Sequence, residues 1–491
     1  MLEAAEIEQT TTKAEYVEAL EKLRIDLLNA QFDLANADFS VVILLGGDDR
    51  PACGAALKAM HEWMDQRHLE THALGPPTEE ERELPPFWRF WHRLPRKGRI
   101  GVFVNGWVQS LIRDALDGDL DDDGIARRNA NIQQFEEDLA HDGTLILKYW
   151  FHLSKKGLQK RLKKAKKHPE KIWWVDEQDR LIYERYDEAL PIAERVLRKT
   201  SSGAAQWNII PSENPYYCHL TFARSLHDRL IHRLAEAPAP AAPLLPAIVS
   251  TGTERRTVLD EVDLSKSLAK EDYDKQRKRL QADLSRLSRE AFEQRVSSVL
   301  VFEGWDAAGK GGVIRRLTWP IDARLFQVVP VAAPTEEEKA HHYLWRFWRQ
   351  LPSAGHHTIF DRSWYGRVLV ERVEGFARED EWRRAYREIN DFEVQLASSG
   401  MVVLKFWLHI DPEEQRRRFQ VREKTAFKKY KITDEDYRNR DKWDAYVAAI
   451  DEMVTRTSTD YAPWHVVPAN DKRHARIKVL KTYVKALKKR L

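Results

Sequence analysis

The 491-residue sequence has few cysteines and no large excess of either charge. Its two cysteines, Cys53 and Cys218, cannot form the disulfide framework of a secreted domain, so we expect a reducing, cytoplasmic location. Lys and Arg total 80 against 77 Asp and Glu, a formal net charge of +3. This balance gives no support to a nucleic-acid partner, and any polyanion site must be a local patch.

Long apolar stretches are also missing from the chain. No run approaches the roughly 18 apolar residues that a membrane-crossing helix needs, and residues 1–30 contain no apolar signal region. We therefore expect no membrane partner. Apolar residues still make up 43% of the chain and charged residues 32%, which is typical of globular domains. Two or three domains are expected at this length.

The sequence contains an internal duplication. The segment WRFW occurs at residues 88–91 and again at 345–348, a shift of 257 residues. KYWFHL, which begins at Lys148, corresponds at the same shift to KFWLHI, which begins at Lys405. A constant shift over so much sequence indicates one large unit repeated once, rather than a solenoid of short repeats.

A segment rich in Pro and Ala separates the two copies. Its composition, APAPAAPLLPAI at residues 237–248, is typical of a semi-rigid extended linker. We therefore predict a first domain at residues 1–236, a linker at 237–250 and a second domain at 251–491.

Short apolar runs rich in β-branched residues alternate with helical stretches in each copy. In the second copy these runs cover residues 298–302, 327–332, 357–361, 402–408 and 464–468. Such alternation predicts an α/β fold in which helices flank a parallel sheet in three layers.

A phosphate-loop motif follows the first of these runs. Residues 304–310 satisfy G-x-x-x-x-G-K between a predicted strand and a predicted helix. Glycines let backbone N–H groups converge on phosphate oxygens at a helix N-terminus, and Lys310 adds a positive charge. The structural alternative is a Gly-rich turn. The predicted loop residues are Gly304, Ala307, Ala308, Gly309, Gly311 and Gly312.

The motif departs from the usual pattern directly after its lysine. Gly311 stands where a Ser or Thr normally binds magnesium, so a carboxylate must take over that role. Asp306 in the loop and Asp361 at the end of the third strand are the candidates, because a parallel sheet places its ligands at the carboxyl edge. Arg362 follows directly and is suited to neutralise charge on a transferred phosphoryl group, with a surface ion pair as the alternative.

Basic residues cluster after the fourth predicted strand. They are Arg416, Arg417, Arg418, Arg422, Lys424, Lys428, Lys429, Lys431, Arg438 and Arg440. The run is either a solvated helix face or a helical lid that closes on phosphate chains and excludes water. The aromatic residues at 345–348 favour a core segment, although Arg346 and Arg349 remain possible ligands of an acceptor phosphate.

Three segments of the second copy together resemble the polyphosphate kinase 2 family. They are GWDAAGKGG from residue 304, FDRSWYGR from residue 360, and KTAFKKYK from residue 424 with RNRDKWDAY after it. The resemblance covers essentially residues 255–491, and the duplicated arrangement resembles the two-domain polyphosphate:AMP phosphotransferases. It implies a P-loop kinase core with a helical lid. It also implies transfer of the terminal phosphoryl of polyphosphate to AMP, with Mg²⁺ and with Mn²⁺ as a substitute.

The resemblance also suggests roles for individual residues. It matches Asp306, Lys310, Asp361 and Arg362 to the loop and second motif of the family. Its less secure matches are Arg367, Glu371, Arg418, Arg422, Lys428 and Lys431. The residues themselves do not decide between AMP and ADP as acceptor, nor do they locate the adenine. A polyphosphate:NDP kinase, an ATP-dependent nucleoside monophosphate kinase and a non-catalytic polyanion-binding module remain alternatives. We also expect a homo-oligomer of undetermined size.

The first copy keeps Gly47 and Asp49 at the positions of Gly304 and Asp306, but it lacks the other catalytic candidates. At a shift of 257, Cys53 falls on the loop lysine, Val104 on the second carboxylate and Asn105 on the arginine. Pro51 removes a loop N–H. The sequence therefore predicts a phosphate-loop fold without catalytic groups, in which Cys53 occupies a vacated lysine position; a reactive thiol is the alternative. The basic residues between 155 and 167 either hold polyphosphate or form a solvated face in a structural partner, and charge runs favour the latter.

Overall fold

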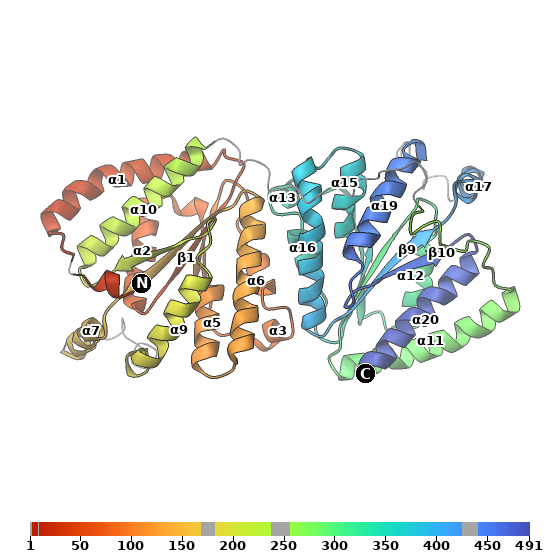
Figure 1. Cartoon of the computed structure of the whole chain (residues 1–491), viewed down its shortest axis with the longest axis horizontal. Coiled ribbons are helices and arrows are strands. Elements are labelled where there is room, and N and C mark those ends of the chain that lie inside the picture. The colour runs from red at the N-terminus through yellow and green to blue at the C-terminus, as the bar shows by residue number, and fades with distance from the viewer. Residues whose placement is uncertain (1, 8, 168–181, 237–255, 425–439) are drawn as a thin grey trace. The chain divides into compact units, whose positions relative to one another are not determined.

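The computed structural model describes the chain except for residues 1, 8, 168–181, 237–255 and 425–439 (Figure 1). The chain divides into two compact units. The first comprises residues 1–76, 89–240 and 336–342, and the second comprises residues 77–88, 241–335 and 343–491. The expected linker at 237–250 lies outside the described residues. A single domain boundary at that linker therefore stays a prediction.

The first unit is built around five strands. They are β1 (Val41–Gly47), β2 (Leu69–Ala73), β3 (Ile100–Val104), β4 (Leu145–His152) and β5 (Trp207–Pro211). The longer helices are α1 (Lys13–Leu34), α2 (Arg50–Trp63), α5 (Trp107–Leu116), α6 (Asp122–His141), α7 (Lys155–Lys167), α9 (Tyr186–Lys199) and α10 (Pro215–Ala235). Helices α1, α2 and α10 pack together on one face of the sheet, and α5, α6 and α9 lie on the other (Figure 1).

The second unit has the same construction. Its strands are β6 (Ser298–Gly304), β7 (Phe326–Pro330), β8 (His357–Asp361), β9 (Val402–His409) and β10 (Trp464–Pro468). Its main helices are α11 (Lys270–Glu293), α12 (Lys310–Thr318), α16 (Glu379–Ser398), α17 (Pro412–Glu423), α19 (Trp443–Thr457) and α20 (Lys472–Arg490). Short turns of helix cover residues Trp345–Trp348 (α14), Trp364–Val368 (η4) and Val370–Val373 (α15). Helices α11 and α20 lie side by side on one face (Figure 1).

Every strand pair in both sheets is parallel. The strand order is β2-β3-β1-β4-β5 in the first sheet and, in the same direction, β7-β8-β6-β9-β10 in the second. The registers also agree, since Val41 pairs with Ile100 as Ser298 pairs with His357, 257 residues further on. The predicted α/β class, the duplication and the five strands of the second copy are thereby confirmed.

The central strands are buried on both faces, as parallel strands usually are. All eight residues of β4 and of β9 are buried, including one lysine in each. Lys148 Nζ lies 2.6 Å from Glu136 Oε2, and Lys405 Nζ lies 2.6 Å from Glu393 Oε2; none of these four side chains is exposed. Each buried cation is therefore compensated by a buried carboxylate, which the low dielectric of a core requires.

The Trp-rich segments belong to the core, as the predicted spacing indicates. Trp345, Phe347 and Trp348 are buried in the second unit. Arg346 Nη1 donates to the Ala332 carbonyl oxygen, and Arg89 Nη2 makes the equivalent bond to the Gly75 oxygen in the first unit. Because both copies make this contact, it serves the fold rather than a catalytic role that only one copy retains.

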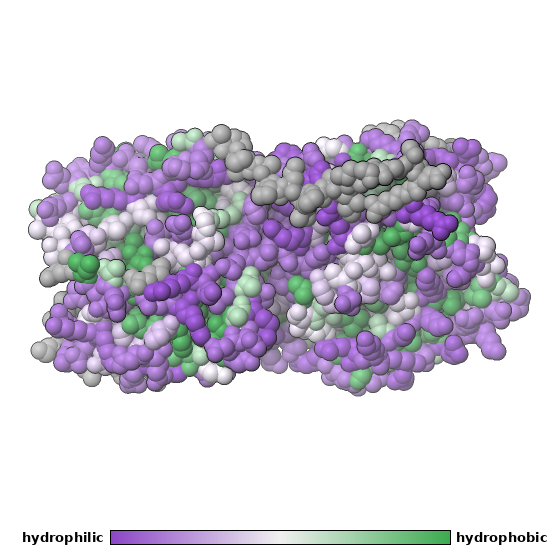
Figure 2. Space-filling view, in the orientation of Figure 1, coloured by the Kyte–Doolittle hydropathy of each residue, from purple (hydrophilic) through white to green (hydrophobic). Residues whose placement is uncertain are grey.

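The face of the molecule drawn in Figure 2 is mostly hydrophilic. Figure 2 shows hydrophilic residues over most of the visible face of each unit, with apolar residues between them. Within the described residues, no helix has both the length and the apolar character required to cross a membrane.

Candidate active site

The phosphate-loop motif forms the connection between β6 and α12, as predicted. Gly304 ends the strand with φ +145°, and a Cβ there would lie 2.6 Å from the Leu408 carbonyl oxygen. Gly309 caps the helix in the left-handed region at φ +110°. The loop can therefore approach β9 and turn into the helix only because these two positions are glycine.

Lys310 begins α12 and turns back over the loop. Its Nζ donates to the Gly304 carbonyl oxygen at 2.6 Å and lies 3.5 Å from that of Trp305. A Cβ at Gly311 would meet nothing within 4 Å, so the first turn of α12 is open at this point. Backbone N–H groups and an ammonium group at a helix N-terminus suit a phosphate anion.

Asp306, Asp361 and Arg362 gather at the same edge of the sheet. Asp361 ends β8 opposite Phe302 of β6, and Arg362 N–H donates to the Phe302 oxygen at 3.0 Å. Arg362 has φ +65°, and its Nη2 lies 3.2 Å from Asp306 Oδ1. The sequence left a surface ion pair as the alternative role of Arg362. Arg362 does form an ion pair, but its partner is Asp306, another predicted catalytic residue of the same site.

Asp306 and Asp361 fit a hard divalent cation, although neither closes a site alone. Among the described residues, the Asp361 carboxylate has no hydrogen-bond or ion-pair partner. The described part of the chain contains no group of three or more His, Cys, Asp or Glu side chains that would hold a metal. This donor set matches Mg²⁺, which is usually bound by one or two carboxylates together with substrate phosphates and water.

Glu303 is a buried carboxyl group that the sequence analysis did not single out. It lies directly before Gly304 and accepts a hydrogen bond from Ser363 Oγ at 2.8 Å. Burial raises the pKa of Glu303 to about 7, against the opposing effect of the Lys310 charge. The corresponding residue of the first copy is Gly46, and this difference between the copies is the sequence signal that identifies Glu303.

The predicted lid arginine Arg418 is instead a support of the loop. It is 3% exposed, and its Nη1 donates to the carbonyl oxygens of Ala307 and Ala308 at 2.9 and 2.8 Å. Its Nη2 donates to the oxygens of Ala469 and Asn470 at 2.6 and 2.9 Å. These bonds join α17 to the phosphate loop and to the end of β10, because one guanidinium provides several donors in fixed directions.

The other, less secure site residues lie in different surroundings. Arg422 lies one turn further along α17 and is half-buried. Arg367 Nη1 lies 3.2 Å from Glu371 Oε2 and 3.8 Å from Glu381 Oε2, and its guanidinium stacks over Tyr343. The two predicted lid lysines lie outside the described residues; they are Lys428 and Lys431.

Trp305 of the loop takes part in an aromatic stack. Trp305 lies parallel to Trp443 of α19, with ring centroids 3.6 Å apart and an interplanar angle of 7°. Its Nε1 donates to His409 Nδ1 at 3.1 Å. Burial lowers the pKa of His409 to about 4, so its ring is neutral near pH 7 and able to accept this bond.

Three cations beside the loop were also not singled out from the sequence. Arg316 Nη1 donates to the Gly312 oxygen at 3.1 Å, and a Cβ at Gly312 would lie 3.6 Å from Arg476 Nη2. Burial, followed by the nearby Arg418 charge, lowers the pKa of Lys472 to about 8. The first copy has no basic side chain of permanent charge at these positions, which hold Ala59, His219 and Pro215.

Comparisons with known proteins identify the family of this chain. The family model described as polyphosphate kinase 2 matches residues 10–238 and 267–491. The chain belongs to the polyphosphate kinase 2 family. A Pseudomonas aeruginosa polyphosphate:AMP phosphotransferase is 47% identical over 488 residues, which cover 98% of this chain and 97% of that protein. A protein of the same name from Pseudomonas syringae pv. tomato is 45% identical over 493 residues, covering 100% of this chain and 98% of its own length.

A solved structure extends the likeness to the whole fold. The crystal structure of a Pseudomonas aeruginosa PA01 protein described as a polyphosphate kinase 2 superposes with a TM-score of 0.89 at 45% identity. It covers 100% of this chain and 99% of that chain. The family resemblance and the tandem fold predicted from the sequence are confirmed.

The first polyphosphate kinase 2 repeat fills its corresponding site with its own side chains. Asp49, the counterpart of Asp306, is fully buried, accepts hydrogen bonds from Ala52 N and Ser212 Oγ, and pairs with Arg161. Burial, followed by the Asp49 charge, raises the pKa of Cys53, so this thiol stays protonated. A buried, protonated thiol does not support the reactive-cysteine alternative.

The titration of Glu303 gives a testable pH dependence. A folded pKa of about 7, above the ordinary value of 4.5, favours the folded state fully below pH 4.5, and this contribution is lost as pH rises through 7. Glu303→Gln stays neutral, so we expect its melting temperature to match the wild type near pH 4. Near pH 8 its melting temperature should exceed that of the wild type, and its free energy of unfolding should be higher by at most about 3 kcal/mol.

Differential scanning calorimetry at the two pH values measures this difference. The exposed Glu293→Gln is the control, and we expect it to leave the pH dependence of the wild type unchanged. A melting-temperature difference between Glu303→Gln and wild type that is the same at both pH values would contradict the buried titration.

Proposed function

We propose that this chain transfers the terminal phosphoryl group of inorganic polyphosphate to AMP, forming ADP, and that the second repeat performs the transfer. The observation that carries the proposal is the convergence of Lys310, Asp306, Asp361 and Arg362 on one open phosphate loop. AMP as the acceptor is supported by the names of the relatives that match over the full length of the chain.

The chemistry of the proposed reaction is mainly positioning and charge compensation. The loop amides and Lys310 would bind the phosphoryl oxygens, and Arg362 would neutralise charge that spreads over the transferred group. Asp306 and Asp361 are the residues that would hold Mg²⁺, with Mn²⁺ as a substitute. The ion would supply further compensation of the phosphate charge. Helix α17 would help to exclude water, which otherwise competes with the acceptor.

The rest of the polyphosphate chain requires further cations. A linear polyanion with a regular charge is bound by Lys and Arg along a groove, without base-specific contacts. Arg316 and Arg476 lie beside Gly312, and Lys472 lies near Arg418. The first repeat has no Lys or Arg at these positions, so we assign the three residues to this chain of phosphates. We also assign Arg422 to the binding of polyphosphate. Arg367 and Glu371 are the candidates for binding the acceptor nucleotide.

The first repeat is proposed to be a structural partner that does no chemistry. Of its basic segment, Lys155 pairs with Asp187, Lys160 with Glu213, and Arg161 with Asp49. Cations that already have carboxylate partners contribute less to binding an added polyanion. We also propose that the chain forms a homo-oligomer. Gel filtration with light scattering would measure its mass.

A donor–acceptor matrix tests the reaction. Polyphosphate or ATP is supplied as the sole donor with AMP, ADP, GMP or GDP, and product nucleotides are separated by ion-exchange chromatography. We expect Mg²⁺-dependent ADP formation from AMP with polyphosphate. Lys310→Ala should lower kcat by about 100-fold or more, because it removes a charge that acts on the transferred group.

Three other outcomes of the matrix correspond to the alternatives. Turnover with ATP but not with polyphosphate as donor indicates an ATP-dependent nucleoside monophosphate kinase. Turnover with polyphosphate when only ADP or GDP serves as acceptor indicates a polyphosphate:NDP kinase. Absence of phosphoryl transfer from any donor, with polyphosphate still bound, indicates a polyanion-binding module. Any of these three results contradicts the proposal.

The assignment of Arg476 is tested separately. Arg476→Ala should raise KM for polyphosphate by about ten-fold and leave KM for AMP unchanged, because one phosphate contact is removed from the donor groove. The control is Arg473→Ala on the same helix, where the exposed Arg473 donates to the Leu268 oxygen. Equal effects of both substitutions, or a change confined to KM for AMP, would contradict the donor groove.

A further inference from the structure

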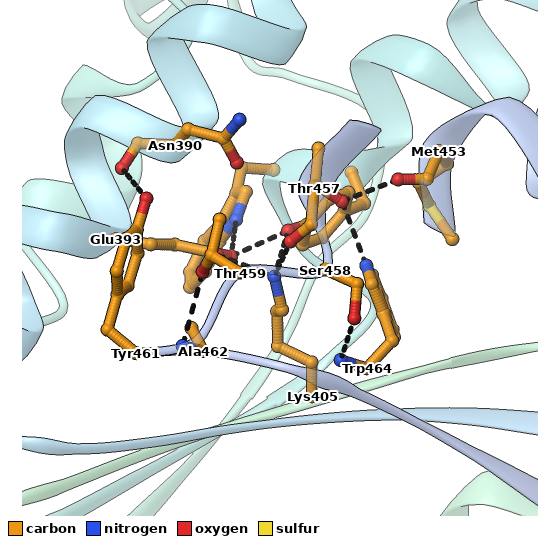
Figure 3. Close-up of polar contacts among 12 residues, drawn as sticks. Asn390, Glu393, Lys405, Met453, Thr457, Ser458, Thr459, Tyr461, Ala462 and Trp464 are labelled. Atoms are coloured by element: carbon orange, nitrogen blue, oxygen red, sulfur yellow. Dashed lines mark hydrogen bonds and ion pairs between the residues drawn. The ribbon is translucent and has the colours of Figure 1, made fainter. Parts of the chain in front are cut away.

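The segment that follows Asp361 is fastened to the buried ion pair of the second repeat. Figure 3 shows Lys405 pointing from its strand toward Glu393 and Thr457. Lys405 Nζ donates to Glu393 Oε2 at 2.6 Å, to the Thr457 oxygen at 2.6 Å and to Tyr365 Oη at 2.8 Å. Tyr365 Oη in turn donates to Glu393 Oε1 at 2.7 Å. All three ammonium protons thus have acceptors, and one of these acceptors, Tyr365, belongs to the segment that follows Asp361.

Tyr365 is held firmly in this position. It is fully buried and its ring lies against Trp464, with centroids 4.6 Å apart. Burial, followed by the Glu393 charge, raises the pKa of Tyr365, so the phenol keeps its proton and remains a donor to Glu393. The neighbouring Trp364 adds a second bond, from its Nε1 to Glu393 Oε1 at 3.1 Å.

A short path connects Tyr365 to the catalytic arginine. The N–H of Tyr365 donates to Ser363 Oγ at 3.3 Å, and this hydroxyl donates to Glu303 Oε1 at 2.8 Å. Arg362 precedes Ser363, and its own N–H is bonded to Phe302 of β6. The backbone that carries Arg362 is therefore held on one side by β6 and on the other by the buried pair.

The first repeat contains the same buried ion pair but lacks the catalytic candidates, so it shows which contacts of the pair the fold itself requires. It keeps the pair of Lys148 with Glu136 and a Trp107 Nε1 bond to Glu136 Oε1 at 2.9 Å. It also keeps the left-handed backbone at Asn105, with φ +56°. Among the side chains that contact the pair, the phenol is missing, because Val108 stands where the second repeat has Tyr365. The bond between Ser363 and Glu303 is missing as well, since Gly106 and Gly46 occupy those positions. The tyrosine thus occurs in the repeat that has the arginine and is absent from the repeat that lacks it.

We propose that Tyr365 is a positioning residue for the phosphoryl transfer: it ties the loop after β8 to the Lys405–Glu393 pair and thereby holds the Arg362 guanidinium beside Asp306. The proposal rests on the role of Arg362 given under the proposed function. Tyr365 does not contact the phosphoryl group in this assignment; it acts through Arg362 alone.

A double-mutant cycle tests this directly. Tyr365→Phe should lower kcat by about ten-fold in the wild-type background, with KM for both substrates within about two-fold. In the Arg362→Ala background, the same substitution should lower kcat by less than about two-fold, because the group it positions is already gone. The cycle uses whichever donor and acceptor give turnover in the wild-type chain, so a different substrate pair overturns the proposed function without affecting this test.

A matched pair of tryptophans provides the structural control. Trp364→Phe and Trp107→Phe each remove one indole bond to a buried glutamate, in the second and first repeat respectively. We expect Trp364→Phe to lower kcat and to couple with Arg362→Ala, and Trp107→Phe to leave kcat within about two-fold of wild type. If Tyr365→Phe does not fold, as judged by circular dichroism, Trp364→Phe replaces it in the cycle. Equal losses in the wild-type and Arg362→Ala backgrounds, or no loss in either, would overturn the proposal.

Discussion

The site depends on the pairing of three parallel strands at the centre of the second sheet. Strand β6 lies between β8 and β9, so the loop after β6 emerges beside the carboxyl end of β8, where Asp361 and Arg362 begin the next connection. Gly304 permits the required close approach to β9, and Arg418 supports the loop from α17. A shift of one residue in either register would move every side chain of that strand to the other face and separate Asp306 from Arg362.

The duplication provides an internal control for each assignment. The first repeat has the same strand order, the same registers and the same buried Lys–Glu pair, and it keeps Arg161 at the position of Arg418. Features shared by both repeats, such as the buried Lys–Glu pair, therefore serve the fold. The aspartate is shared too, but Asp49 is fully buried and paired with Arg161, whereas Asp306 contacts Arg362. Features found only in the second, such as Lys310, Asp361, Tyr365 and the cations of α12 and α20, are those that we propose to serve the chemistry or to support it.

Much of this was predictable from the sequence because local patterns determined it. The shift of 257, the strand runs and the glycines around Lys310 each depend on a few neighbouring residues, and all were confirmed in the fold. The burial of Arg418 was not predictable, because a basic run does not show which arginine faces inward. Glu303, Tyr365 and Arg476 were missed for a related reason: their roles depend on contacts between elements that are 28 or more residues apart in the sequence.

The central claim is that one repeat performs phosphoryl transfer and the other preserves only its fold. Asp306→Asn and Asp49→Asn make the same chemical change at corresponding positions, and the initial rate of ADP formation from AMP and polyphosphate compares them. We expect Asp306→Asn to lower kcat by about 100-fold or more and Asp49→Asn, assayed below its unfolding transition, to stay within about two-fold of wild type. Comparable losses in both variants, or full activity of Asp306→Asn, would contradict the account.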